Sequence, residues 1–157
     1  MTTLSELVEE CLPDVQEIMP WHLVERMAGV PGLLIVDVRE PYEFEAMHIE
    51  GSVCVPRGIL EAACEWGYED TLPELAAGRD REIVVVCRSG RRSVLAAYAM
   101  QRLGFLNVRS LRTGLRGWND YDEPLVDADG AVVGTNDADS FFLSRLRPDQ
   151  MPPKAGN

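Results

Sequence analysis

Residues 83–93, IVVVCRSGRRS, decide the fold of this chain. The first four form an unbroken apolar, β-branched run, which is typical of a strand buried on both faces of a parallel sheet. Residues 91–103 carry apolar side chains nearly all round a helical axis and stop at a glycine, so they predict a largely buried helix. The stretch therefore predicts a strand, a short turn at residues 87–90 and a helix, which is the repeating unit of parallel α/β sheets.

The same alternation extends on both sides of this unit. Further strands are predicted at residues 33–37, 52–55 and 107–111, and helices at residues 20–28, 41–47 and 57–68. A short amphipathic helix begins at Ser5 and ends at Pro13. Strands that alternate with helices predict an α/β fold, with a mostly parallel sheet covered by helices on both faces.

The size and charge of the chain limit its functions. Its 157 residues suffice for one domain with a core and short terminal extensions. A net charge of −11 argues against general nucleic-acid binding and against contact with an anionic membrane surface. No apolar run approaches the roughly 18 residues of a membrane span, and the acidic N-terminus lacks the features of a secretory signal. We therefore expect a cytoplasmic protein without nucleic-acid or membrane partners.

The turn after the strongest strand is the candidate site, because ligands of open α/β folds gather beyond the carboxyl ends of the strands. Cys87 follows the strand, and Arg88, Arg91 and Arg92 lie within five residues of it. Backbone N–H groups of such a turn converge on an anion, and the start of the following helix adds a partial positive charge. These features favour a thiolate or a persulfide anion. The alternative is a buried structural cysteine beside a solvated arginine cluster.

Residues 87–93, CRSGRRS, closely resemble the active-site loop of the rhodanese-like sulfurtransferases. Other motifs similar to that family follow in the right order, namely IVDVREPYEF at 35–44, HIEGS at 48–52, PRG at 56–58 and LRTGLRGW at 111–118. The resemblance covers about residues 18–125, most of the chain. One departure is Thr113, which stands where the family usually has the first of two glycines, so the turn there could differ.

The resemblance implies a single-domain sulfurtransferase with a rhodanese-like three-layer fold and a five-stranded central sheet. Residues 18–125 would form the domain, residues 1–17 a helical N-terminal extension, and residues 126–157 a C-terminal extension that is partly loose. Cys87 would be the nucleophile and carry sulfur as a persulfide, without a metal or an organic cofactor. The substrate-binding loop would consist of Arg88, Ser89, Gly90, Arg91, Arg92 and Ser93. Among these, Arg88 is the candidate contact to substrate and Arg92 is expected to brace the loop.

Four residues outside the loop are considered for supporting roles. Asp37 and Arg39 end an apolar strand at the edge where the site should form, and in the family this pair is chiefly architectural. Arg57 could line the rim of the site. His48 is not expected to be catalytic, because a persulfide nucleophile needs no base near neutral pH and the matching family histidine is usually structural.

The remaining cysteines show neither a CxxC pair nor a regular metal-ligand spacing. In a reducing compartment they are most simply free thiols. Cys54 lies in a predicted strand and is expected to be a small buried apolar residue. Cys11 and Cys64 lie in predicted helices and could be exposed, which leaves a resolving role open.

Several functions compete on this evidence. The basic loop favours an enzyme that moves sulfane sulfur from a small anionic donor such as thiosulfate to cyanide, a small thiol or a protein thiol. A second reading is a carrier whose sulfur donor and acceptor are proteins, and a third is a noncatalytic binding or regulatory module. Phosphatase chemistry is disfavoured, because related phosphatases place an arginine six residues after the cysteine, where this chain has Ser93.

Overall fold

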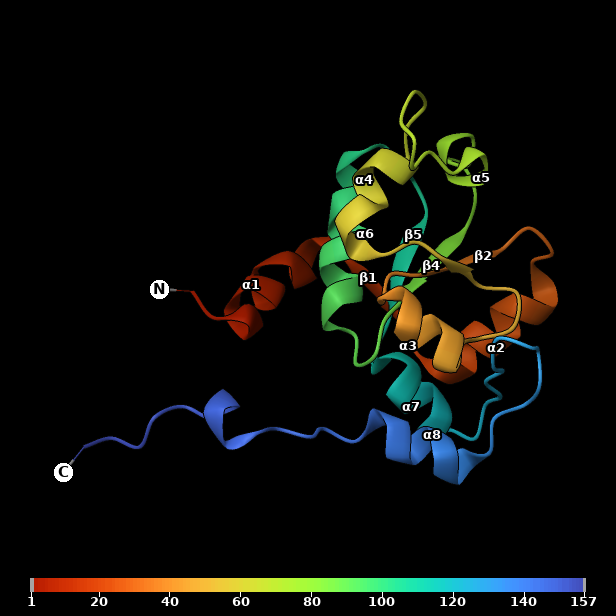
Figure 1. Cartoon of the computed structure of the whole chain (residues 1–157). Helices are drawn as coiled ribbons and strands as arrows, with labels where there is room; N and C mark the ends of the chain where they lie inside the picture. The colour runs from red at the N-terminus through yellow and green to blue at the C-terminus, as the bar shows by residue number, and fades with distance from the viewer. Residues whose placement is uncertain (1, 157) are drawn as a thin grey trace.

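The fold is built on a five-stranded sheet in which each strand pairing is parallel. The computed structural model describes residues 2–156. The strands are β1 (Gln16–Ile18), β2 (Leu34–Asp37), β3 (Val53–Cys54), β4 (Ile83–Val86) and β5 (Val108–Leu111), in the spatial order β1-β5-β4-β2-β3. Helices lie on both sides of the sheet (Figure 1), so the predicted α/β class is confirmed.

The helices follow the strands along the chain. They are α1 (Leu4–Cys11), α2 (Pro20–Gly29), α3 (Pro41–Ala46), α4 (Leu60–Ala63), α5 (Pro73–Ala76), α6 (Arg91–Arg102), α7 (Gly114–Asp120) and α8 (Thr135–Phe142). Short 3-10 turns lie at Leu12–Asp14, Arg57–Ile59 and Pro148–Gln150. Proline at the first position starts α2, α3 and α5, where its missing N–H costs no hydrogen bond. No helix formed by residues 2–156 is long and apolar enough to cross a bilayer.

Strand β4 is fully buried and contributes to two cores, one on each face of the sheet. Ile83 and Val85 join the core beneath α1, α4, α5 and α6. Val84 and Val86 join the opposite core, beneath α2, α7 and α8. This alternation follows from the two-residue period of a strand, and burial on both faces explains why the run has no polar member. The strand therefore delivers Cys87 to the carboxyl edge at the middle of the sheet.

Several elements differ from the prediction. β1 is missing from it, because two of its three side chains are exposed and an edge strand of this kind has no apolar signature. The predicted helix at residues 57–68 is a 3-10 turn followed by α4, and the chain turns again at Gly67, whose φ is +94°. Helix α5 begins at Pro73, in a segment for which no helix is predicted.

Both predicted extensions contact the rest of the protein. Helix α1 packs against α6 and adds Val8 and Cys11 to the core, while β1 runs across the predicted boundary at residue 18. Helix α8 packs against α7 and buries Phe142. Residues 148–156 are exposed, and Figure 1 shows this tail leading away from the sheet. The limits of the central domain remain a prediction.

Candidate active site

The sulfur of Cys87 lies in a cradle of backbone amides. The N–H groups of Gly90 and Ser93 donate to Sγ, at N···S distances of 3.1 and 3.3 Å. Ser93 Oγ lies 3.3 Å from the sulfur and 2.7 Å from Ser110 Oγ on β5. N–H dipoles that converge on one atom stabilise negative charge there, so the cradle suits a sulfur anion. Cys87 is 1% exposed, so the loop encloses its sulfur almost completely.

Gly90 allows the loop to turn tightly above the sheet. Its φ is +95°, in the left-handed region that a residue with a Cβ avoids. A Cβ at this position would also lie 3.3 Å from the Leu111 carbonyl oxygen and 3.3 Å from the Thr113 nitrogen. The loop therefore rests directly on the turn that follows β5.

The start of α7 supports the loop from the other side. The Leu115 amide donates to the carbonyl oxygen of Cys87 at 2.8 Å. Gly114 has φ +63°, and a Cβ there would lie 2.5 Å from the Ser89 nitrogen, which no side chain could tolerate without movement of the backbone. The backbone around Cys87 is therefore held between α6 and α7.

The three arginines of the loop have different partners. Arg88 is half-buried, and its Nη2 donates to the Phe142 carbonyl oxygen at 2.6 Å, at the end of α8. Arg92 donates twice to the Glu43 carboxylate, at 2.8 and 3.0 Å, and so links the loop to α3. Arg91 is exposed, and within residues 2–156 its side chain has no hydrogen bond or ion pair. Two of the three cations are therefore already engaged.

The Arg92 pair alters the ionisation of Glu43. Burial disfavours the charged carboxylate, but the hydrogen bonds and charge of Arg92, together with the Glu40 amide, outweigh that penalty. The pKa of Glu43 therefore lies below its ordinary value of 4.5. A carboxyl group with a lowered folded-state pKa stabilises the fold above its unfolded-state pKa, and this contribution is lost as the pH falls through the folded-state pKa.

We expect the free energy of unfolding to decrease as the pH drops below about 4.5, and to decrease less steeply in Glu43→Gln, which has no carboxyl to protonate. Urea denaturation followed from about pH 6 to about pH 3 measures both slopes. Glu45→Gln, which changes an exposed carboxyl on the same helix, is the matched control. Identical slopes for wild type and Glu43→Gln would contradict the assignment.

Asp37 and Arg39 form a fully buried ion pair at the end of β2. Arg39 Nη2 lies 2.9 Å from Asp37 Oδ2, and both side chains are 0% exposed. The same Nη2 donates to the Met47 carbonyl oxygen at 2.6 Å, and Asp37 Oδ1 accepts the Arg39 amide at 3.1 Å. Val38 between them donates its amide to the Val86 carbonyl oxygen at 3.0 Å, next to the loop that begins at Cys87. The pair therefore connects β2 with the segment after α3 at the edge that carries the site.

The other predicted supporting residues lie in local contacts of their own. Arg57 is half-buried and forms an ion pair with Glu61. His48 Nδ1 is 2.8 Å from the Phe44 carbonyl oxygen, and the two rings stack with centroids 3.8 Å apart. The His48 backbone also forms an antiparallel bridge to Val126. Their roles in the site remain predictions.

Exposure of Cys11 and Cys64, which the sequence left open, is not found, because both are buried. Each lies at a helix end that packs inward, which only the packing of α1 and α4 decides. Burial raises the pKa of Cys64 to about 11. Cys54 is half-buried rather than fully buried, and burial together with the nearby Asp37 carboxylate raises the pKa of its thiol. Thiols that keep their proton are poor nucleophiles, so Cys54 and Cys64 are less suited to nucleophilic chemistry than Cys87, whose amide contacts suit an anion.

Some contributors to the site are absent from the sequence prediction. Ser110 is a buried polar residue of β5 that contacts Ser93. A serine within a predicted buried strand is a sequence signal that could have pointed to this contact. Glu43 is a buried carboxylate whose partner lies far away in sequence. The Phe142 carbonyl has no sequence signal at all, because any residue there supplies the same oxygen.

The sheet is parallel, and its central strand leads into a cysteine that lies in an amide-lined turn before a helix. These features define an α/β protein with an anion-binding thiol site. Residues 21–121 match the rhodanese-like domain family. The chain belongs to this family of sulfurtransferases and sulfur carriers, as its loop motif predicts.

Two relatives differ in how much of their length is shared. The chain is 32% identical to a sulfurtransferase of Allochromatium vinosum over 117 residues, which are 74% of this chain and 99% of that protein. It is 38% identical over 119 residues to YrkF of Bacillus subtilis strain 168, a candidate sulfur carrier protein. That match covers 76% of this chain but only 59% of YrkF.

Solved structures show the same architecture. A protein of unknown function from Rhodopseudomonas palustris, described as a candidate tyrosine phosphatase, is 26% identical, with a TM-score of 0.72 over 79% of this chain and 94% of its own. A thiosulfate sulfurtransferase from Pseudomonas aeruginosa is 22% identical, with a TM-score of 0.63 over 87% of this chain and 25% of its own. The second likeness shows the fold alone.

Proposed function

We propose that Cys87 takes sulfane sulfur from thiosulfate or another persulfide donor and passes it to a thiophilic acceptor. The observation that carries this proposal is the convergence of the Gly90 and Ser93 amides on Sγ. Helix α6 begins at Arg91 and adds the positive end of its dipole to the same place. The sulfurtransferase relative that this chain matches over 99% of the relative's length supports transfer of sulfur as the reaction class.

The reaction has two balanced halves. The Cys87 thiolate attacks the outer sulfur of thiosulfate, a new S–S bond forms, and the S–S bond of thiosulfate breaks with its electron pair leaving on sulfite. An acceptor such as cyanide or a thiolate then attacks the outer sulfur of the persulfide, and Sγ departs as a thiolate. Because donor and acceptor react in turn with one group, the kinetics should be ping-pong. Neither half requires a metal or an organic cofactor.

An intact-mass measurement tests the proposal directly. The protein is incubated with thiosulfate, and the expected product carries the mass of one added sulfur atom, which is lost on addition of cyanide. Trypsin mapping should place that sulfur on the peptide that contains Cys87. If no donor, small or protein-bound, loads this cysteine, the proposal fails and a noncatalytic module remains.

Arg88 is proposed to attract the anionic donor. A guanidinium has five N–H donors, and one of them bonds the Phe142 carbonyl oxygen, which leaves others for an anion. We expect Arg88→Ala to slow loading from thiosulfate roughly tenfold, which is the effect of losing one charge-assisted hydrogen bond. Loading from a neutral organic persulfide should change less. Arg102→Ala, which removes an exposed cation from the other end of α6, is the control. Equal losses with both donors would refute the electrostatic role.

A carrier between proteins is the second candidate. YrkF, the relative named as a candidate sulfur carrier, favours it, and so does the exposed side chain of Arg91 at the start of α6. Negligible turnover with every small donor, together with loading from a protein persulfide, would select this function. Phosphatase activity is not proposed, since the sixth position after the cysteine is Ser93, whose hydroxyl bonds Ser110 rather than offering a cation.

A further inference from the structure

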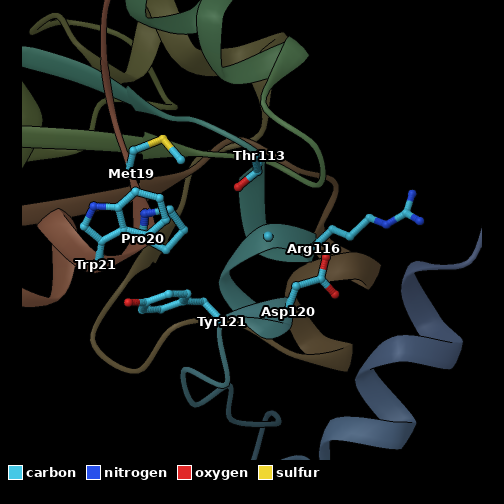
Figure 2. A pocket seen from close by; sticks show the side chains of 8 residues that line it. Met19, Pro20, Trp21, Thr113, Arg116, Asp120 and Tyr121 are labelled. Carbon is cyan, nitrogen blue, oxygen red and sulfur yellow. The ribbon is translucent and has the colours of Figure 1, made fainter.

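A pocket of about 290 Å³ lies beside the catalytic loop, between the ends of β1 and β5 and helix α7. Trp21 and Tyr121 form one wall (Figure 2). Their ring centroids are 5.2 Å apart. Met19 and Pro20 add further apolar surface. Trp21 is 39% exposed and Tyr121 is 50% exposed, so the pocket holds aromatic surface that a bound group would cover. Its volume suits one large aromatic side chain.

Thr113 belongs to both the pocket and the catalytic loop. Its backbone nitrogen lies 3.3 Å from the position of a Cβ on Gly90, whereas its side chain lines the pocket. Its φ is +71°, a conformation that is strained for a β-branched residue and is usually left to glycine. A glycine at position 113 would relieve this backbone strain, but the chain has threonine there. The Thr113 side chain packs against Gly117 and occupies part of the pocket.

The polar groups around the pocket indicate what it would bind. Arg116 and Asp120 of α7 line it (Figure 2). Both are exposed and have no ion pair among residues 2–156. Arg112, just before Thr113, is also exposed and without an ion pair in that range. On a chain with a net charge of −11, these arginines make a local basic rim that complements an acidic partner. The Asp120 carboxylate is an acceptor for an indole N–H or a phenol O–H.

We propose that this pocket receives a tryptophan or tyrosine side chain of a protein sulfur acceptor, flanked by carboxylates that meet Arg116, which lines the pocket, and Arg112, which precedes Thr113 in the chain. The inference rests on the proposed function, because the acceptor's cysteine thiolate attacks the outer sulfur of the Cys87 persulfide. One S–S bond forms, the Sγ–S bond breaks, Cys87 leaves as a thiolate, and the acceptor carries the persulfide away. An aromatic anchor with an arginine beside it is the composition found at binding hot spots.

The sheet order sets the distance between the anchor and the thiol of the acceptor. The pocket lies at the ends of β1 and β5, and Cys87 follows β4, the next strand. With strands about 4.8 Å apart, the lateral offset is one to two spacings, roughly 5–10 Å. Two or three extended residues span that distance, at about 3.3 Å per residue. The acceptor should therefore carry its aromatic residue two or three positions away from its cysteine.

The test uses a synthetic acceptor, acetyl-Glu-Trp-Gly-Ser-Cys-Gly-amide, and the same peptide with alanine in place of tryptophan. Sulfur transfer from the loaded full-length protein is followed by the mass of the peptide, and transfer to cyanide is measured in parallel. We expect the tryptophan peptide to be about tenfold the better acceptor. In Trp21→Ala, the ratio of the tryptophan-peptide rate to the cyanide rate should fall about tenfold. Trp66→Ala removes a tryptophan that lies outside the pocket and is more exposed, at 61% against 39% for Trp21, and it should leave that ratio unchanged.

Three results would overturn the inference. The first is equal transfer rates for the tryptophan and alanine peptides, and the second is an equal fall of the rate ratio in Trp66→Ala. The third is a rate for free benzyl mercaptan that exceeds the alanine-peptide rate as much as the tryptophan-peptide rate does, which would make the pocket a small-molecule site. Failure of the proposed function is recognised separately, because Cys87 then never loads. In that case the pocket is tested by binding alone, with a fluorescent form of the tryptophan peptide that has serine in place of cysteine. Binding that Trp21→Ala weakens about tenfold supports the pocket, and binding that it leaves unchanged rejects it.

Discussion

Replacement of Cys87 by serine is expected to lower sulfur transfer by at least roughly 1,000-fold, because it removes the nucleophile on which both halves of the reaction depend. The substitution is nearly isosteric, and the Gly90 and Ser93 amides that bond Sγ can bond a hydroxyl oxygen instead. The fold should therefore persist. Steady-state turnover of thiosulfate and cyanide, with circular dichroism as the check on folding, measures the two effects separately.

Cys54→Ser is the matched control for this substitution. Cys54 is half-buried in β3, two strands away from β4, and the raised pKa of its thiol makes it a poor nucleophile. We expect this variant to retain turnover. Substantial activity in Cys87→Ser, or a comparable loss in Cys54→Ser, would show that the sulfur is carried elsewhere.

Asp37→Ala is expected to destabilise the protein by about 3–5 kcal/mol, because it leaves the guanidinium of Arg39 buried without its counter-charge. Both side chains are fully buried, and Arg39 Nη1 already lacks a hydrogen-bond partner among the described residues. If Asp37 is removed, further N–H groups of Arg39 lose their hydrogen-bond acceptor, and no solvent reaches them to replace it. Urea or thermal unfolding of the purified variant at neutral pH measures the loss.

The double variant Asp37→Leu with Arg39→Met separates charge from packing. It removes both charges and keeps apolar volume, so it should recover most of the stability lost in Asp37→Ala. Glu74→Ala provides the exposed comparison, since its ion pair with Arg81 is largely solvated and should contribute about 1 kcal/mol or less. A loss in Asp37→Ala no larger than that in Glu74→Ala would disprove the cost assigned to the buried charge.

The C-terminal extension makes a direct hydrogen bond to the loop of Cys87. The Phe142 carbonyl oxygen accepts a hydrogen bond from Arg88. The Phe142 side chain is buried in the core beneath α7 and α8. One of the arginines proposed to meet the donor is thus held by the part of the chain that lies outside the family match, which ends at residue 121. A donor bound at Arg88, as proposed, would share the guanidinium with a contact that the extension already makes.

The sequence alone determined the parallel α/β class and the position of the candidate nucleophile. Both follow from local rules: an unbroken β-branched run predicts a strand buried on both faces, and the glycine turn before a helix places Cys87 among backbone amides. These features lie within eleven neighbouring residues, 83–93, so no long-range contact is needed to infer them. The loop motif also predicted the family that the comparison confirms.

The tertiary structure alone decided which groups meet. Arg92 finds Glu43 across 49 positions of sequence, and Arg88 finds the Phe142 carbonyl across 54. The aromatic wall of Trp21 and Tyr121 likewise exists only because β1 pairs with β5, and β1 has no apolar pattern to reveal it. Side-chain partners are selected by packing between distant elements, and periodicity along a chain reports which face is buried but not what lies against it.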